Sequence, residues 1–438
     1  MRSLLATIIL LISATWFSCE NGSVDSIPQN PEFANFTPLS GGKGTIITLN
    51  GKELGNNVGN VSLKINGISA TVLTVNDTQV TATVPPKSGL GTLELSVNGK
   101  ILTSTEKFRY LYTATTSYFT GGTQGYSDGP AKSVKFEGPY NITYDAKGII
   151  HVVDLGNCAI RRVEPDGTTS TLAGAPQAGF KDGKGNQARM HFPIGVDIAA
   201  DGIIYVADSY NHAIRKIATD GSLTTIAGNP ERPGQLDGNI KDAQFKTPYG
   251  VRMDKNGVLW VCDSENALIR KISADGQVTT FAGSTEGFAN GKLRDAKFYY
   301  PVYLTFDEGG NVFVADKHNH CIRKISSDGM VTTFAGKPGQ KGWADGKSTD
   351  ASFNQPSNVQ IDKLGNLYVT DLYNHCIRLV YSDGAVTTLA GQPTVNGYLE
   401  GKGDQAKFYH PQGSALDKNG DLYITDSYNS VIRKLTIE

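Results

Sequence analysis

Short runs of alternating apolar and polar residues fill the chain from residue 31 to residue 438, and Gly, Asn, Asp and Pro separate these runs. An apolar side chain at every second position is typical of a β-strand with one buried face. The 50 glycines of the chain suit the many tight turns that such short strands require. The pattern therefore predicts an all-β protein.

Residues 31–112 predict a small β-sandwich. Three runs of alternating residues, Thr45–Leu49, Val61–Ile65 and Leu93–Val97, each lead into an Asn-Gly pair. Asn-Gly readily adopts the positive φ angles of a two-residue hairpin, so we expect tight turns at Asn50-Gly51, Asn66-Gly67 and Asn98-Gly99. Strands at this spacing are typical of sandwiches.

Three phrases in this segment resemble the IPT/TIG family of immunoglobulin-like domains. They are Phe36-Thr37-Pro38-Leu39-Ser40-Gly41-Gly42, Ile47-Thr48-Leu49-Asn50-Gly51 and Val84-Pro85-Pro86. The resemblance implies a spacer or interaction module.

The strongest pattern is a motif that recurs six times between residues 113 and 438. An Asp near the end of a strand repeats every 53 to 55 residues, an Asn follows three positions later, and an Ile-Arg pair comes next. The repeated residues are Asp154, Asp208, Asp263, Asp316, Asp371 and Asp426, then Asn157, Asn211, Asn266, Asn319, Asn374 and Asn429, then Arg161, Arg215, Arg270, Arg323, Arg378 and Arg433. Because every copy carries them, we expect a structural role, with each Arg bridging a carboxylate and a backbone carbonyl between blades.

This motif, as in Val206–Arg215, resembles the NHL-repeat propeller family. The resemblance implies one six-bladed β-propeller with four strands per blade, for example Gly195–Ile198, Ile203–Ala207, Ala213–Ile217 and Leu223–Ala227. The sixth copy ends at Arg433–Glu438 without its fourth strand. We therefore expect Ser117–Gly122 to supply that strand and to close the ring of residues 113–438.

The N-terminus predicts export. Met1-Arg2 is a basic start, Leu4–Phe17 is mostly apolar, and Ser18-Cys19 follows. Residues 1–18 resemble a bacterial lipoprotein signal, which implies a lipid on Cys19 and a tether over residues 19–30. The alternative is plain secretion with an incidental cysteine. With the two folded domains, the chain resembles surface lipoproteins of Bacteroidota and predicts an outer-membrane or cell-surface location.

Composition excludes several classes of function. The formal charge of −1 offers no basic field for nucleic acid. Cys158, Cys262, Cys321 and Cys376 fall at repeat positions or in a strand, so we expect small buried hydrophobes rather than disulfides. The innermost strands carry one carboxylate beside one Arg and no His, so we expect no metal and no cofactor. The residues in question are Thr143, Asp197, Arg252, Thr305, Gln360 and Ala415.

Residues that differ between the copies are the candidates for ligand binding. The repeat position of His212, His320 and His375 instead predicts packing or hydrogen bonding, and the aromatic residues of the inter-blade loops predict packing. The candidate residues are Tyr140, His191, Tyr249, Tyr299, Tyr300, Tyr303, Trp343, Gln355, Tyr373, His410 and Gln412.

Aromatic rings, amides and hydroxyls on a nearly neutral face favour sugar binding. The leading hypothesis is thus a non-catalytic, monomeric surface protein that binds a polysaccharide or oligosaccharide. Two alternatives remain open. One is a protein-interaction scaffold with an outer-membrane protein partner, and the other is a propeller lyase or hydrolase acting at the central channel.

Overall fold

The structure is a computed structural model that describes residues 30–438. The predicted signal, most of the predicted tether and Cys19 lie outside the described residues. Within residues 30–438 no helix is both long enough and apolar enough to cross a membrane. The chain forms two compact units, which consist of residues up to Leu39 with Gly44–Pro85 and Thr92–Lys107, and of Ser40–Lys43, Pro86–Gly91 and Phe108–Glu438.

The first unit contains most of the β-sandwich, and the sandwich residues 40–41, 90–91 and 108–110 are grouped with the second unit. The sheet order of the sandwich is β1-β3-β6-β5-β4-β7-β8-β2, and β5 pairs with β6 on one side and with β4 on the other. Side chains alternate between buried and partly exposed along the whole of β7, as the sequence pattern requires. The strands are β1 Glu32–Thr37, β2 Ser40–Gly41, β3 Ile46–Lys52, β4 Val61–Ile65, β5 Ile68–Asn76, β6 Gln79–Thr83, β7 Leu90–Val97 and β8 Lys100–Tyr110.

Two of the three predicted Asn-Gly hairpins are confirmed. Asn66-Gly67 joins β4 to β5 and Asn98-Gly99 joins β7 to β8, and all four residues have positive φ. The prediction at Asn50-Gly51 is wrong, because both residues lie inside β3 and pair with β1. A Cβ atom at Gly51 would lie 2.1 Å from the carbonyl oxygen of Glu32, so the glycine permits a close approach of β1 rather than a turn.

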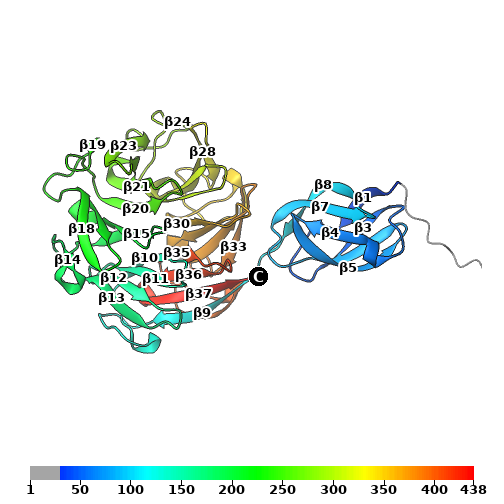
Figure 1. Ribbon diagram of the computed structural model, residues 1–438, viewed down its shortest axis with the longest axis horizontal. Helices are drawn as coiled ribbons and strands as arrows, with labels where there is room; N and C mark the ends of the chain where they lie inside the picture. The colour runs from blue at the N-terminus through cyan, green and yellow to red at the C-terminus, as the bar shows by residue number, and fades with distance from the viewer. Residues whose placement is uncertain (1–29) are drawn as a thin grey trace, which may run out of the picture. The chain divides into compact units, whose positions relative to one another are not determined.

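The second unit is a propeller of six antiparallel sheets arranged in a ring (Figure 1). Each blade starts with an inner strand, and each inner strand packs against the inner strands of both neighbouring blades. Blades 1 to 6 are numbered by these strands: β10 Pro139–Tyr144, β15 Pro193–Ile198, β20 Pro248–Met253, β25 Pro301–Phe306, β30 Pro356–Ile361 and β35 Pro411–Leu416.

The second and third strands of each blade follow as hairpin partners. The second strands are β11 Ile150–Asp154, β16 Ile204–Asp208, β21 Leu259–Asp263, β26 Val312–Asp316, β31 Leu367–Asp371 and β36 Leu422–Asp426. The third strands are β12 Ala159–Val163, β17 Ala213–Ile217, β22 Leu268–Ile272, β27 Cys321–Ile325, β32 Cys376–Val380 and β37 Val431–Ile437.

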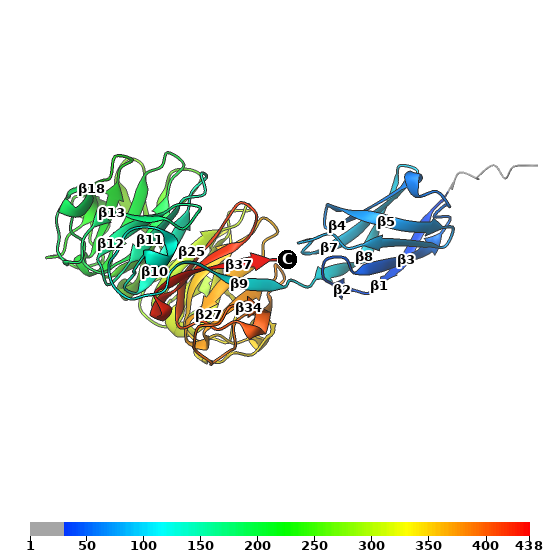
Figure 2. The same cartoon turned by 90° about the horizontal axis from the view of Figure 1, so that it is seen from below.

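The fourth strand of blade 6 comes from the start of the propeller. This strand, β9 (Ala114–Gly121), pairs antiparallel with β37 from Gly121 opposite Val431 to Ala114 opposite Ile437. Figure 2 shows the cyan β9 lying along the red β37. The fourth strands of blades 1 to 5 are β13 Thr169–Gly174, β18 Ser222–Gly228, β23 Gln277–Ala282, β28 Met330–Ala335 and β33 Ala385–Ala390.

Five blades carry a further strand that the sequence did not predict. A two-residue Gly-containing segment of the inter-blade loop pairs with the outer strand and shortens the exposed edge of the blade. These strands are β14 Gly183–Lys184, β19 Gly238–Asn239, β24 Gly291–Lys292, β29 Gly346–Lys347 and β34 Gly401–Lys402.

Apolar side chains form the cores between neighbouring blades. Between blades 3 and 4, for instance, Phe298 of the connecting loop packs with Ile269 of one blade and Leu304 of the next. Cys158, Cys262, Cys321 and Cys376 are all buried and free, which confirms their prediction as small hydrophobes.

Candidate functional site

The six prolines that begin the inner strands define one face of the propeller, which we call the proline face. The turns after the second strands lie at the same face, because the first and second strands are antiparallel and Pro193, for example, pairs with Asp208. Five of these turns are 3₁₀ turns: η4 Ser209–Asn211, η5 Ser264–Asn266, η6 Lys317–Asn319, η8 Leu372–Asn374 and η10 Ser427–Asn429.

The repeated Asp, Asn and Arg residues form one buried network in each blade. In blade 1, Arg161 Nη1 donates to Asp154 Oδ2 over 2.6 Å, and Arg161 Nη2 donates to Asp128 Oδ1 over 2.6 Å. Asn157 Nδ2 also donates to Asp154 Oδ2, over 2.9 Å. Burial raises the pKa of Asp154 to about 6, although Arg161 and these hydrogen bonds act to lower it.

This network is structural, as predicted, but it does not link the parts of the propeller that the sequence predicted it to link. Arg161 also donates to the carbonyl oxygens of Lys135 and Ser127, which belong to the loop before the same blade. The arginine therefore fastens each blade to its own preceding loop instead of joining two blades. The side chains of Arg161 and Asp154 have no exposed surface, so these two residues cannot contact a ligand.

The aromatic residues of the inter-blade loops cover these arginines. Four rings lie over a guanidinium group at 4.3 to 5.0 Å, a cation–π geometry that supports the predicted packing role. The pairs are Tyr126 with Arg161, Phe180 with Arg215, Phe288 with Arg323, and Tyr398 with Arg433. Trp343 occupies the equivalent position in blade 5 and is 56% exposed at the rim.

The three repeated histidines connect neighbouring blades. The Nδ1 atom of each accepts a hydrogen bond from the backbone N–H of the residue before the next proline, and the donors are Thr247, Gln355 and His410. The corresponding acceptors are His212, His320 and His375. The prediction of a hydrogen-bonding role is confirmed. Burial lowers the pKa of His375 to about 4, and the adjacent His410 lowers it further.

Tyrosines meet at the centre of the proline face. The ring of Tyr140 in blade 1 lies 6.3 Å from that of Tyr249 in blade 3, so the two rings approach each other across the mouth of the channel. Tyr249 in turn contacts Tyr300, which precedes the proline of blade 4, at 5.2 Å. Burial raises the pKa of all three hydroxyls above the usual 10, and they remain neutral hydrogen-bond donors.

A lysine that the sequence analysis missed lies beside these tyrosines. Lys317, the first residue of η6, is 9% exposed, and its ammonium group lies 5.9 Å from the centre of the Tyr249 ring. Burial lowers the pKa of Lys317 to about 8. The sequence could have singled out Lys317 by a comparison of equivalent repeat positions, because it is the one charged residue among them. These positions are Leu155, Ser209, Ser264, Lys317, Leu372 and Ser427.

Two groups of aromatic rings flank this centre. Tyr210 packs against His191 and Phe192 at 5.2 to 5.4 Å, and more than half of its surface is exposed. On the side of blades 5 and 6, His410 lies 4.9 Å from Tyr373 and 4.4 Å from Tyr428.

Blade 4 contributes a third group of aromatic contacts to the proline face. Tyr299 and Tyr300 both contact His318, at 4.9 and 4.7 Å. Burial lowers the pKa of His318 to about 4, and the charge of Lys317 contributes to this shift.

Tyr303 and Gln412 lie below the surface. Tyr303 is 1% exposed, and its hydroxyl lies 3.4 Å from both Arg252 Nη1 and Gln360 Nε2 in the wall of the channel. Gln412 is also buried, and its backbone carbonyl oxygen accepts a hydrogen bond from Ser357 Oγ over 2.7 Å. The structure therefore brings Tyr140, Tyr249 and Tyr300 together at the centre and places Tyr303 and Gln412 beneath them.

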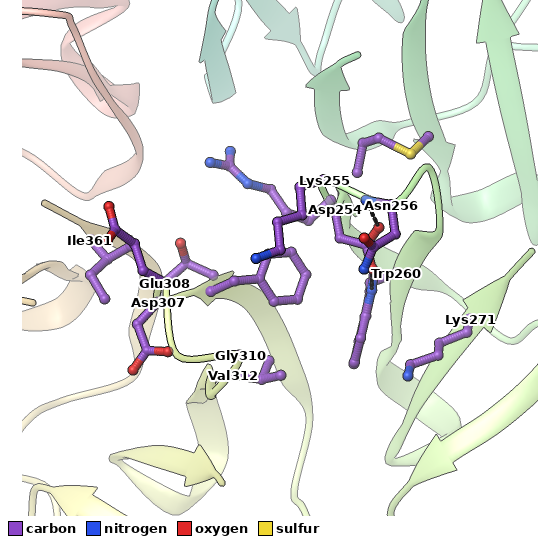
Figure 3. A pocket seen from close by; sticks show the side chains of 14 residues that line it. Asp254, Lys255, Asn256, Trp260, Lys271, Asp307, Glu308, Gly310, Val312 and Ile361 are labelled. Carbon is purple, nitrogen blue, oxygen red and sulfur yellow. Dashed lines mark hydrogen bonds between the residues drawn. The ribbon is translucent and has the colours of Figure 1, made fainter. Parts of the chain in front are cut away.

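The described residues form clefts on both faces. A cleft of about 370 Å³ opens on the proline face beside Tyr428, between blades 1 and 6. A larger cleft of about 690 Å³ lies at the other face, where turns join the first and second strands of blades 3 and 4 (Figure 3).

The larger cleft is lined by residues whose contacts stabilise the blade. Trp260 Nε1 donates to Asp254 Oδ2 over 2.9 Å, and Lys271 covers the Trp260 ring at 3.9 Å. Similar contacts recur in blade 5, where the Tyr368 hydroxyl donates to Asp362, and in blade 6, where Lys434 covers Tyr423. Within residues 30–438, no group of three or more His, Cys, Asp or Glu residues is arranged to hold a metal ion.

The fold and the family comparisons define the class of protein. Residues 31–110 match the IPT/TIG domain, and residues 190–217, 298–325 and 353–378 match the NHL repeat. The chain is an IPT/TIG domain followed by a six-bladed NHL-repeat propeller.

Among curated proteins, the chain is similar to NHL repeat-containing protein 2 of Homo sapiens. The two are 30% identical over 326 residues, which cover 66% of this chain and 44% of the human protein. The chain thus spans less than half the length of this relative.

Two solved structures from Bacteroides thetaiotaomicron VPI-5482 share the fold over 94% of this chain. One is a structural genomics protein of unknown function, with a TM-score of 0.61, 22% identity and 98% of its own chain covered. The other is an auxiliary nutrient binding protein, with a TM-score of 0.59, 20% identity and 99% of its own chain covered.

Proposed function

We propose that this protein is a non-catalytic binding protein that holds a glycan on the proline face of its propeller. The observation that carries this proposal is the set of exposed aromatic rings around the central tyrosines. Tyr210, Tyr373 and Tyr428 each keep more than 40% of their surface exposed, and each is braced by a neighbouring ring. Such rings stack on the apolar faces of sugars at little conformational cost, because they are already held in place.

Two further observations support a binding role. The cleft beside Tyr428 provides a concave surface next to an exposed ring. The auxiliary nutrient binding proteins of Bacteroides share this fold, which supports a binding role for the propeller. The proposal also includes export of the protein, a lipid on Cys19 and display at the outer membrane.

Affinity electrophoresis against a panel of neutral and acidic polysaccharides tests the proposal. We expect at least one polysaccharide to retard the intact protein, and the double variant Tyr210→Ala/Tyr428→Ala to lose that retardation. Lys255→Ala, an exposed change on the opposite face, serves as the control and should migrate like the wild type. Free migration of the wild type through every polysaccharide would reject glycan binding and favour a protein partner at the outer membrane.

A further inference from the structure

We propose that the centre of the proline face binds the anionic group of an acidic glycan, a carboxylate or a sulfate ester, with the ammonium group of Lys317 as the counter-charge. This inference rests on the proposed glycan-binding function and adds the class of glycan.

The ammonium group of Lys317 is directed toward the central tyrosines of the proline face. The lysine belongs to blade 4, yet its ammonium group lies 5.9 Å from the ring of Tyr249 in blade 3. Burial lowers the pKa of His410 in blade 6, and the charge of Lys317 adds to this shift. A side chain of blade 4 that lies near Tyr249 of blade 3 and whose charge acts on His410 of blade 6 extends toward the axis of the propeller. Lys317 is therefore placed where a ligand centred on the face would contact it.

The ammonium group of Lys317 has no partner of opposite charge. Within residues 30–438 it forms no ion pair and donates no hydrogen bond, and burial alone accounts for its lowered pKa. It is also absent from the enclosed unpaired polar atoms, which means that it keeps contact with solvent. Lysine is almost never buried without a partner, because desolvating its charge is costly. An anion at this point would supply the missing partner.

Blade packing does not require a charge at this position. Ser209 and Ser264, the equivalent residues of blades 2 and 3, each donate a hydrogen bond to the carbonyl oxygen of the next blade's proline over 2.5 Å. Leu155 and Leu372 fill the position in blades 1 and 5. Serine or leucine thus satisfies the architecture, and lysine in blade 4 forgoes the inter-blade hydrogen bond that serine makes.

The surroundings suit an anion carried by a sugar. The ammonium group lies near the ring of Tyr249, whose neighbours Tyr140 and Tyr300 add further neutral hydroxyl groups to the centre of the face. The flanking rings offer stacking surfaces for the sugar. The acidic residue Glu265, on the turn of blade 3, pairs with Lys246 at 3.6 Å and so does not neutralise Lys317. A charge-assisted hydrogen bond in this partly desolvated site is stronger than a neutral one.

Isothermal titration calorimetry with matched oligosaccharides tests the inference. One pair is an oligogalacturonide and its methyl ester, which separates the carboxylate from the sugar ring. The second pair is a carrageenan oligosaccharide and its desulfated form, which does the same for the sulfate ester. We expect the acidic member of at least one pair to bind the wild type at least about tenfold more tightly than its neutral counterpart.

The variant Lys317→Leu installs the residue that blades 1 and 5 already carry. It should lose about ten- to a hundredfold in affinity for the acidic ligand and keep its affinity for the neutral one. Lys246→Leu removes a paired lysine from the same face and should bind as the wild type does. Equal binding of both members of each pair to the wild type, or unchanged binding of the acidic ligand by Lys317→Leu, would overturn the inference. Failure of both members of every pair to bind would instead overturn the proposed function.

Discussion

Arg433 Nη1 donates a hydrogen bond to Asp426 Oδ2 over 3.0 Å, and neither side chain has any exposed surface. Equivalent pairs occur in all six blades, with Nη1-to-Oδ2 distances from 2.5 to 3.0 Å. A buried ion pair is expensive to break, because the remaining charge stays in a medium that solvates it poorly. Each pair joins the second and third strands of its blade, and the same arginine donates to carbonyl oxygens of the preceding loop, as Arg433 does to Lys407 and Leu399. Because every blade carries this pair, function is left to residues that differ between blades.

Removal of one partner should destabilise the propeller strongly. We expect Asp426→Ala to lower the free energy of unfolding by about 3–5 kcal/mol, because Arg433 would remain buried without its carboxylate. Urea denaturation followed by fluorescence measures the change. Glu265→Ala breaks an ion pair of half-exposed side chains and should cost less than about 1 kcal/mol. Similar losses in both variants would contradict a structural role for the buried pair.

Ring closure by β9 makes the whole propeller depend on residues 113–122. Their deletion leaves β37 without its outer neighbour, from Val431 to Ile437. Calorimetry should show a lower melting temperature for the propeller, since six blades stabilise one another only in a complete ring. Deletion of residues 20–29 removes a segment of equal length and should leave the transition unchanged. A propeller that melts normally without residues 113–122 would show that another strand closes the ring.

In the sandwich, Gly51 permits the close approach of β1 to β3. We expect Gly51→Ala to lower the free energy of unfolding of this unit by about 1–3 kcal/mol, because the new Cβ would lie 2.1 Å from the Glu32 carbonyl oxygen. Gly59→Ala, where the nearest atom is 3.2 Å away on the side chain of Asn57, should have little effect. Hydrogen exchange of the β1 amides provides a local measurement of the same difference.

The aromatic residues of the propeller should fall into two sets, one that stabilises the fold and one that binds the glycan. Phe288 covers Arg323 at 4.5 Å, so Phe288→Ala should lower stability by about 0.5–2 kcal/mol and leave glycan binding intact. Tyr428 is exposed, so Tyr428→Ala should weaken glycan binding and leave the melting temperature unchanged. Thermal denaturation and calorimetric titration of both variants check the two outcomes. The opposite assignment of effects would contradict the proposed face.

The stability of the protein should depend on His375 in the acidic range. Burial and His410 hold the pKa of His375 at about 4 in the folded state, below its ordinary value of 6.5. Between about pH 6.5 and pH 4, the unfolded chain therefore binds a proton that the folded protein does not, and stability falls as the pH falls. His375→Ser, which installs the residue found at the same position of blade 6, should reduce this loss. Chemical denaturation at pH 7 and pH 4.5 compares the two proteins.

Local patterns predicted most of the fold. Alternating residues gave β4 at Val61–Ile65 with the observed bounds, because a strand with one buried face imposes period two on its sequence. The resemblance to the NHL repeat gave β17 at Ala213–Ile217, also with the observed bounds. The hairpins at Asn66-Gly67 and Asn98-Gly99 were also predicted correctly, because Asn and Gly readily adopt the positive φ angles of a tight turn. Asn50-Gly51 failed because the approach of β1, distant in sequence, determines the role of Gly51.

The sequence by itself determined the architecture of this protein, since a motif repeated six times must occupy six equivalent environments. It also predicted that function would lie where the copies differ. Only the tertiary structure decided which of those differing residues meet. Tyr140, Tyr249 and Lys317 come from blades 1, 3 and 4, and the ring brings their side chains together near one axis. The same packing buries Tyr303 and Gln412 beneath the surface. Spacing along the chain does not give the distance between side chains of different blades. The unpaired charge of Lys317 could therefore be identified only from the folded propeller.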